Sequence, residues 1–136
     1  MSDPNPAPAG CTRAPGPQRV LVVDDDTMNL RFAARLLRDL GYSGALASDG
    51  HKALRLIDEQ PFDLVLLDIN MPGMNGQDTL KALRARPGKR LPVLMVSGHG
   101  DDDTVRHFSS LGADGLLLKP LAAVQLRQAI ARTTGR

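Results

Sequence analysis

Short apolar runs alternate with amphipathic segments along most of the chain. A run of Val, Leu and Met without polar residues is typical of a strand that is buried on both faces of a sheet. Four such runs predict strands, and a weaker run between the first two predicts a fifth. The predicted strands are Val20–Val23, Gly44–Ser48, Leu64–Leu67, Val93–Val96 and Leu116–Leu118.

Each predicted strand is followed by apolar residues at helical spacing, which predict an amphipathic helix. Asp26 and Asn75 are the expected N-caps of the first and third helices, and Asp101–Asp103 cap the fourth. Glycine or proline follows the first four segments and marks their ends. The expected helices cover about residues 27–40, 50–59, 76–86, 102–111 and 121–130.

Five successive strand–helix units predict an α/β fold. The units would form a doubly wound, flavodoxin-like (βα)5 domain with a five-stranded parallel sheet of order 2-1-3-4-5. In this order the four strong strands lie side by side. The weak strand at Gly44–Ser48 is then expected at an edge of the sheet.

Composition sets the domain organisation and excludes several classes of protein. The length of 136 residues favours one domain, which we expect over residues 19–133. Five of the ten prolines lie before residue 18, so residues 1–18 are expected to be a disordered leader. The net charge of +2 and the aromatic content of 3% argue against direct nucleic-acid binding.

The same composition predicts a cytoplasmic protein that does not enter a membrane. No apolar stretch approaches the roughly 20 residues that a membrane-spanning helix needs. The first residues contain no continuous apolar core of the kind found in a secretory signal. Cys11 is the single cysteine, which excludes an internal disulfide and is typical of a reducing compartment.

Polar side chains follow the four strong strands at the point where each one ends. They are Asp24–Asp25, Asp68, Ser97 and Lys119. The carboxyl ends of parallel strands share one edge, so these groups are expected to lie together. Two carboxylates 4 Å apart repel by roughly 4 kcal/mol at an effective dielectric constant of 20, which a bound cation would relieve. Mg²⁺ prefers oxygen ligands and often joins carboxylates to phosphate.

An aspartate can also attack phosphorus, and a metal, a hydroxyl and an ammonium can then stabilise the developing charge. The four strand ends supply such groups. The sequence therefore predicts phosphoryl chemistry at this edge of the sheet.

The residues around these positions resemble the motifs of receiver domains of two-component response regulators, the CheY-like superfamily. The similarity extends from about Arg19 to Ile130, and Asn29 is a hint of the hybrid histidine kinase type. The matching segments, in order, are VLVVDDD (Val20–Asp26), DLVLLDINMPGMNG (Asp63–Gly76), VLMVSGHG (Val93–Gly100) and GADGLLLKP (Gly112–Pro120).

The resemblance implies a phosphoacceptor with a metal site beside it. Asp68 is implied to be the phosphoacceptor. Asp25 and Asp68 are implied to bind Mg²⁺ directly, together with the backbone carbonyl of Asn70. Asp24 is implied to support the metal through water.

The resemblance also implies roles for residues that contact the phosphoryl group. Ser97 would hydrogen-bond a phosphoryl oxygen and move on activation, and Lys119 would pair with the phosphoryl group and precede a cis peptide bond. His99 is a candidate for tuning water access, with an ordinary loop histidine as the alternative. Leu116 departs from the family, because this switch position is usually aromatic, and it puts the usual readout in question.

The predicted function is a phosphoryl-accepting signalling switch. A histidine kinase or a histidine phosphotransfer protein would phosphorylate Asp68 in the presence of Mg²⁺, and output would pass through contacts with an unidentified protein target. The domain would catalyse only its own phosphotransfer and dephosphorylation, so it is not predicted to be an enzyme that acts on other substrates.

Two alternatives belong to other functional classes. A degenerate receiver could serve only as a protein-binding scaffold. A small phosphatase of the haloacid-dehalogenase type would use similar groups, but its first motif is Asp-x-Asp-x-Thr/Val and the segment Asp24–Met28 ends in Met.

Overall fold

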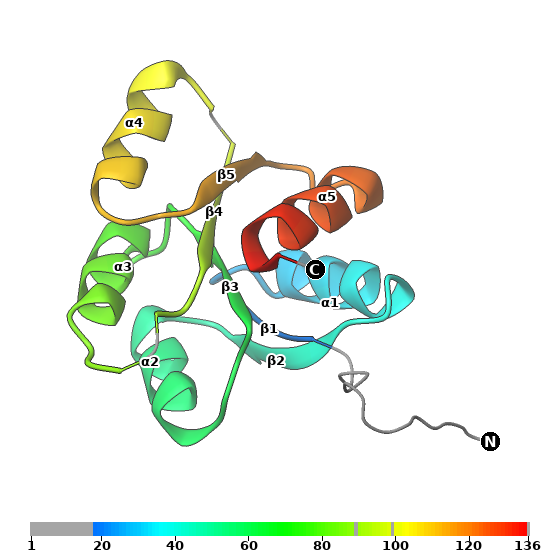
Figure 1. Cartoon of the computed structure of the whole chain (residues 1–136), viewed down its shortest axis with the longest axis horizontal. Coiled ribbons are helices and arrows are strands. Elements are labelled where there is room, and N and C mark those ends of the chain that lie inside the picture. The colour runs from blue at the N-terminus through cyan, green and yellow to red at the C-terminus, as the bar shows by residue number, and fades with distance from the viewer. Residues whose placement is uncertain (1–17, 89, 99, 136) are drawn as a thin grey trace.

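The computed structural model describes residues 18–88, 90–98 and 100–135. A parallel sheet of order β2-β1-β3-β4-β5 forms the centre, and helices cover both of its faces (Figure 1). The predicted fold class and strand order are confirmed. The elements in chain order are β1 (Arg19–Val23), α1 (Thr27–Asp39), β2 (Ser43–Ala47), α2 (Gly50–Glu59), β3 (Leu64–Asp68), α3 (Gly76–Arg84), β4 (Val93–Ser97), α4 (Asp102–Ser110), β5 (Gly115–Leu118) and α5 (Ala123–Thr134).

Two apolar layers, one on each face of the sheet, form the core. Alternate residues of each central strand point to opposite faces, as in any strand. In β1, Leu21 and Val23 pack with α2, α3 and α4, whereas Val20 and Val22 pack with α1 and α5. All residues of β3 and β4 are buried, which explains why these strands have no polar alternation.

Strand β2 lies at one edge of the sheet, as the weak pattern predicted, and begins one residue earlier than expected. It pairs only with β1, in a register that places Gly44 opposite Val20. A Cβ atom on Gly44 would lie 1.8 Å from the carbonyl oxygen of Val20, and its φ of +154° also favours glycine. The close approach of the two backbones therefore requires glycine at this position.

Side-chain caps begin four of the five helices. Asp26, Asp49, Asn75 and Asp101 each accept a hydrogen bond from a backbone N–H in the first turn of the helix that follows. The caps predicted at Asp26, Asn75 and Asp101 are confirmed. The caps lie at the carboxyl edge of the sheet, so they also fix the loops that carry the polar residues of that edge.

The predicted leader lies outside the described residues except for Gln18. Gln18 is buried, and its carbonyl oxygen accepts a hydrogen bond from the backbone N–H of Ser43. Among the described residues, none of the helices combines the length and the apolar character that crossing a bilayer requires.

Candidate functional site

Five of the predicted site residues lie at the carboxyl edge of the sheet, and four of them end or directly follow a strand. Asp68 and Ser97 are the last residues of β3 and β4, while Asp24 and Lys119 directly follow β1 and β5. Asp24, Asp68 and Ser97 are buried, with exposed fractions of 6%, 3% and 3%. Strands β3 and β4 are each one residue longer than predicted, so the sheet itself positions the Asp68 and Ser97 side chains.

A lysine joins the two buried carboxylates. The Nζ atom of Lys119 lies 3.0 Å from Oδ1 of Asp68 and 3.4 Å from Oδ2 of Asp24. The backbone N–H of Lys119 donates to the carbonyl oxygen of Ser97 at 2.8 Å, which ties the loop after β5 to the end of β4. The peptide bond between Lys119 and Pro120 is cis.

Asp24 and Asp25 are adjacent in sequence but differ in their surroundings. Oδ1 of Asp24 accepts a hydrogen bond of 2.9 Å from the backbone N–H of Asp26, so both of its oxygens have partners. Asp25 is exposed. Oxygens of Asp24, Asp25 and Asp68 all lie within 4.8 Å of one another. The carboxylate of Asp25 is thus exposed to solvent. Those of Asp24 and Asp68 are buried and contact other groups of the protein.

The pKa values of Asp68 and Lys119 both depart from their ordinary values. Burial raises the pKa of Asp68, and the negative charge of Asp24 adds to the rise, although a hydrogen bond from Lys119 opposes it. Burial alone would lower the pKa of Lys119, but its contacts with Asp68 and Asp24 outweigh burial and raise that pKa. Among the described residues, the site thus brings three carboxyl groups together with the ammonium of Lys119.

This donor set fits a divalent cation. Three carboxylates with oxygens so close together repel one another, and a cation between them would remove the repulsion. The side-chain donors are all oxygen, which is the ligand type of Mg²⁺. Asn70 is exposed in the loop after β3, and its backbone hydrogen-bonds Asp68.

Gly76 allows the start of helix α3 to pack closely against the backbone at the end of β3. Its N–H donates to the carbonyl oxygen of Ile69 at 3.0 Å. A Cβ atom on Gly76 would lie 2.4 Å from the carbonyl oxygen of Asp68 and 2.7 Å from Cα of Ile69. In the sequence, Gly76 is the last residue of a matching segment, and the apolar pattern contains no signal for so close a backbone approach.

Leu116 and His99 were also predicted to affect the switch, and the structure describes only Leu116. Leu116 is partly buried and packs against the core layer beneath α2, α3 and α4. His99 lies outside the described residues. A Cβ atom added to its neighbour Gly100 would lie 2.6 Å from the side chain of the exposed Leu118 of β5.

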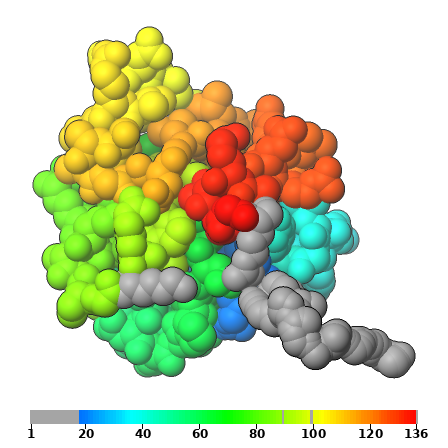
Figure 2. Space-filling model, in the orientation of Figure 1, coloured from blue at the N-terminus to red at the C-terminus, as the bar shows by residue number. Residues whose placement is uncertain are grey.

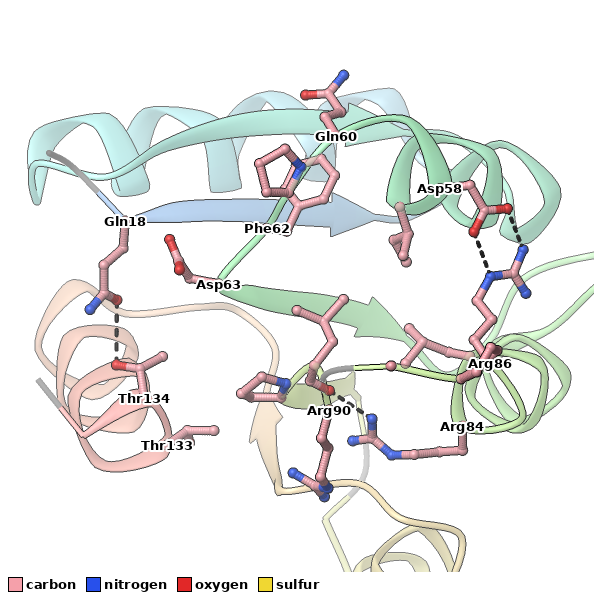
Figure 3. Close-up of a pocket in the computed structure, with 17 residues that line it drawn as sticks. Gln18, Asp58, Gln60, Phe62, Asp63, Arg84, Arg86, Arg90, Thr133 and Thr134 are labelled. Atoms are coloured by element: carbon pink, nitrogen blue, oxygen red, sulfur yellow. Dashed lines mark hydrogen bonds and ion pairs between the residues drawn. The ribbon is translucent and has the colours of Figure 1, made fainter. Parts of the chain in front are cut away.

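A large cavity lies at the opposite, amino edge of the sheet. It has a volume of about 900 Å³ and includes none of the predicted site residues (Figure 3). Arg84 lies beside it and holds two loops together: its guanidinium donates to the carbonyl oxygens of Leu91 at 2.7 Å and Gly112 at 2.8 and 2.9 Å, and contacts Asp114 at 3.1 Å. These contacts indicate a structural role for this arginine.

We expect Arg84→Lys to lower the free energy of unfolding by about 1 kcal/mol. An ammonium cannot reproduce the planar fork that bonds two carbonyls at once, and one partly buried hydrogen bond contributes about 1 kcal/mol. The matched control is Arg86→Lys, because Arg86 pairs with the exposed Asp58 and exposed pairs contribute little. Urea unfolding, followed by circular dichroism, gives the free energy of unfolding of both variants. Equal losses in the two variants would contradict the structural role of Arg84.

Comparison with known families identifies the domain. The model of the response regulator receiver domain matches residues 20–131. The chain belongs to the receiver domain family. A receiver domain is a phosphoryl-accepting switch of two-component signalling, and this is the function of the chain.

Curated relatives include both single-domain and much longer proteins. Chemotaxis protein CheY of Pseudomonas aeruginosa is 40% identical over 114 residues, which cover 82% of this chain and 92% of that protein. Sensor histidine kinase GacS of Pseudomonas protegens is 38% identical over 128 residues, which cover 91% of this chain. The receiver domain spans only 14% of the length of GacS.

One similar solved structure is relevant to the predicted magnesium site. The receiver domain of sensor histidine kinase PA1611 from Pseudomonas aeruginosa aligns with a TM-score of 0.80 and 27% identity, covering 88% of this chain and 99% of that one. It is described with a magnesium ion coordinated in its active-site cleft. Receiver domains bind Mg²⁺ in an acidic site, and this chain has an acidic cluster formed by Asp24, Asp25 and Asp68.

Proposed function

We propose that Asp68 accepts the phosphoryl group, and that the donor is a phosphohistidine of a histidine kinase or of a histidine phosphotransfer protein. The observation that supports this is the ammonium of Lys119, 3.0 Å from the Asp68 carboxylate within an otherwise acidic pocket. The Asp68 oxygen would form a bond to phosphorus as the phosphorus–nitrogen bond breaks, and the imidazole would leave with the bonding electrons.

Lys119 and Ser97 would stabilise the charge that develops on the phosphoryl oxygens. Lys119 already pairs with Asp68 and needs little movement to contact an oxygen bound to the same carboxylate. Ser97 is buried at the end of the neighbouring strand β4, which is paired with β3. Fixed donors aimed at developing charge are a major source of catalysis. The domain would thus catalyse its own phosphorylation and dephosphorylation and act on no other substrate.

Mg²⁺ would be held by Asp25 and Asp68, by the backbone carbonyl of Asn70, and by Asp24 through water. When bound, it would neutralise the carboxylates and the phosphoryl oxygens. The close grouping of the three carboxylates, with oxygens within 4.8 Å of one another, supports this assignment. Asp24 is the least suited to direct ligation, because both of its oxygens have protein partners.

The donor would approach beside α1. A cavity of about 240 Å³ lies between α1 and the loop after β5, and Asp24 and Lys119 form part of its wall. Phe32 on the same wall and the nearby Met28 are exposed by 47% and 70%, so an apolar side chain of a partner could cover them. The donor protein and this domain would meet in the cytoplasm, without contact to nucleic acid or membrane.

Output would pass to an unidentified protein target. Val105 of α4, Leu118 of β5 and Val124 of α5 are exposed apolar side chains, with exposed fractions of 41%, 52% and 59%. Apolar side chains at the surface of neighbouring elements are typical of a contact surface. Leu116, two residues before Leu118 in β5, would transmit the change through aliphatic packing in place of an aromatic ring.

Intact mass after incubation with acetyl phosphate tests the function. The expected result is one added phosphoryl group with Mg²⁺ and none with a chelator, and peptide mapping should place the group on Asp68. Absence of any adduct from several small donors, with the fold verified, would instead favour the scaffold function. Repeated hydrolysis of external phosphate esters would favour the phosphatase alternative.

A further inference from the structure

A cavity interrupts the apolar layer that α1 and α5 share. The two helices cover the same face of the sheet, and their surfaces lie next to each other in Figure 2. The cavity has a volume of about 240 Å³ and reaches down to the sheet, where Val22, Leu66 and Val96 line it. These three buried residues belong to the adjacent strands β1, β3 and β4. The apolar layer on this face is therefore incompletely filled.

The size of this cavity limits what it can hold. Protein interiors rarely contain spaces much larger than a water molecule, and apolar atoms that line such a space lack packing partners. An apolar cavity of roughly 150 Å³ is enough to bind benzene. Sites for larger ligands usually have volumes of roughly 300–1,000 Å³. The cavity beside α1 lies between these values, so it has room for a single ring with a small substituent.

One polar side chain of the cavity wall is available to a ligand. Asn29 of α1 is half-buried, and within the part of the chain that the structure describes its side chain makes no hydrogen bond. An amide can both donate and accept a hydrogen bond, as a hydroxyl group can. Asn29 therefore offers the cavity one hydrogen-bonding partner for a neutral polar group.

The remaining wall of the cavity argues against a charged ligand. Phe32 and Ala33 of α1 and Leu121 after β5 supply apolar surface. The two charged side chains of the wall, Asp24 and Lys119, lie 3.4 Å apart and pair with each other. A charged group that entered the cavity would lose water without gaining a free opposite charge, which is unfavourable. The wall thus favours an uncharged ligand.

We propose that this cavity binds a small neutral ring compound that carries a hydroxyl group. The ring packs against Val22, Leu66 and Val96, and the hydroxyl group hydrogen-bonds the side-chain amide of Asn29. The donor contact proposed above uses the exposed surface of Met28 and Phe32, whereas this ligand occupies the space that reaches the strands. The inference does not depend on phosphorylation of Asp68.

Two ring compounds that differ only in the hydroxyl group, para-fluorophenol and fluorobenzene, are the probes. Fluorine NMR gives the dissociation constant of each probe from the full chain. We expect the wild type to bind para-fluorophenol about fivefold more tightly than fluorobenzene, the usual effect of one hydrogen bond between uncharged groups.

Variants of the wall test the two parts of the site separately. Asn29→Ala should bind para-fluorophenol only as tightly as fluorobenzene, because the partner of the hydroxyl group is missing. Gln128→Ala is the matched control and should keep the preference of the wild type, since Gln128 is an exposed amide on α5 that does not line the cavity. Ala33→Met would place a longer apolar side chain in the cavity and should weaken the binding of both probes.

Amide chemical shifts of the wild type locate the bound probe, so the result does not depend on whether Ala33→Met folds. The expected shift changes lie in α1 and in the residues that follow β5. Shift changes confined to the cavity at the amino edge would overturn the inference, as would binding of neither probe. Equal affinity of the wild type for both probes, or a preference that persists in Asn29→Ala, would also overturn it. Failure of Asp68 to take up a phosphoryl group would overturn the proposed function alone.

Discussion

Asp68→Asn is expected to abolish phosphoryl uptake from a phosphohistidine donor and from acetyl phosphate. An amide of the same shape keeps the packing at the end of β3, but it has no carboxylate oxygen to attack phosphorus. The intact mass after incubation with donor and Mg²⁺ should therefore equal that of the untreated variant. The matched control is Asp58→Asn, since Asp58 is an exposed carboxylate on α2 and should not affect uptake.

The same variant should be more stable than the wild type when metal is removed. Burial and the charge of Asp24 raise the pKa of Asp68, which means that the folded site disfavours the charged carboxylate despite Lys119. A neutral amide avoids this cost, so urea unfolding in the presence of a chelator should show a higher free energy of unfolding. Saturating Mg²⁺ should stabilise the wild type more than the variant. An adduct that persists in Asp68→Asn would show that another residue accepts the phosphoryl group.

The fold and the gathering of site residues could be predicted because they depend on local pattern. Uninterrupted apolar runs identified strands buried on both faces, and the sheet places the ends of those strands at one edge. The polar residues Asp68 and Ser97 were expected just after their strands, yet each is the last residue of its strand. The difference is small, because a parallel ladder can continue through a polar residue whose side chain points into a site.

Other features could not be predicted because they depend on how distant elements approach one another. His107 and Gln77 are 30 residues apart and both lie on polar helix surfaces, where the sequence pattern leaves the partner undetermined. The bonds from Arg84 to Gly112 likewise depend on the packing of two loops. From the sequence, Gly76 looks like an ordinary first residue of a helix. A larger residue is excluded there by the nearby backbone at the end of β3.

Gly76→Ala is expected to lower the free energy of unfolding by about 2–3 kcal/mol, the usual cost of forcing extra volume into a packed site. Alanine favours a helix over glycine by up to about 1 kcal/mol, but that gain is smaller than the cost of the clash. The atoms 2.4 and 2.7 Å from the added Cβ belong to the backbone of Asp68 and Ile69, so no side chain can turn away to relieve it. Helix α3 or the end of β3 must shift, and phosphorylation of Asp68 should slow as well.

Gly98→Ala is the matched control for this clash. Gly98 also follows a site residue, Ser97, but a Cβ atom there would meet no atom within 4 Å. Its free energy of unfolding should stay within about 0.5 kcal/mol of the wild type, as for most exposed substitutions. Urea unfolding in chelator and the rate of adduct formation with acetyl phosphate measure the two effects. A Gly76→Ala variant as stable as Gly98→Ala would mean that the start of α3 can move away from β3 at little cost, so that the loop beside Asp68 is set by other contacts.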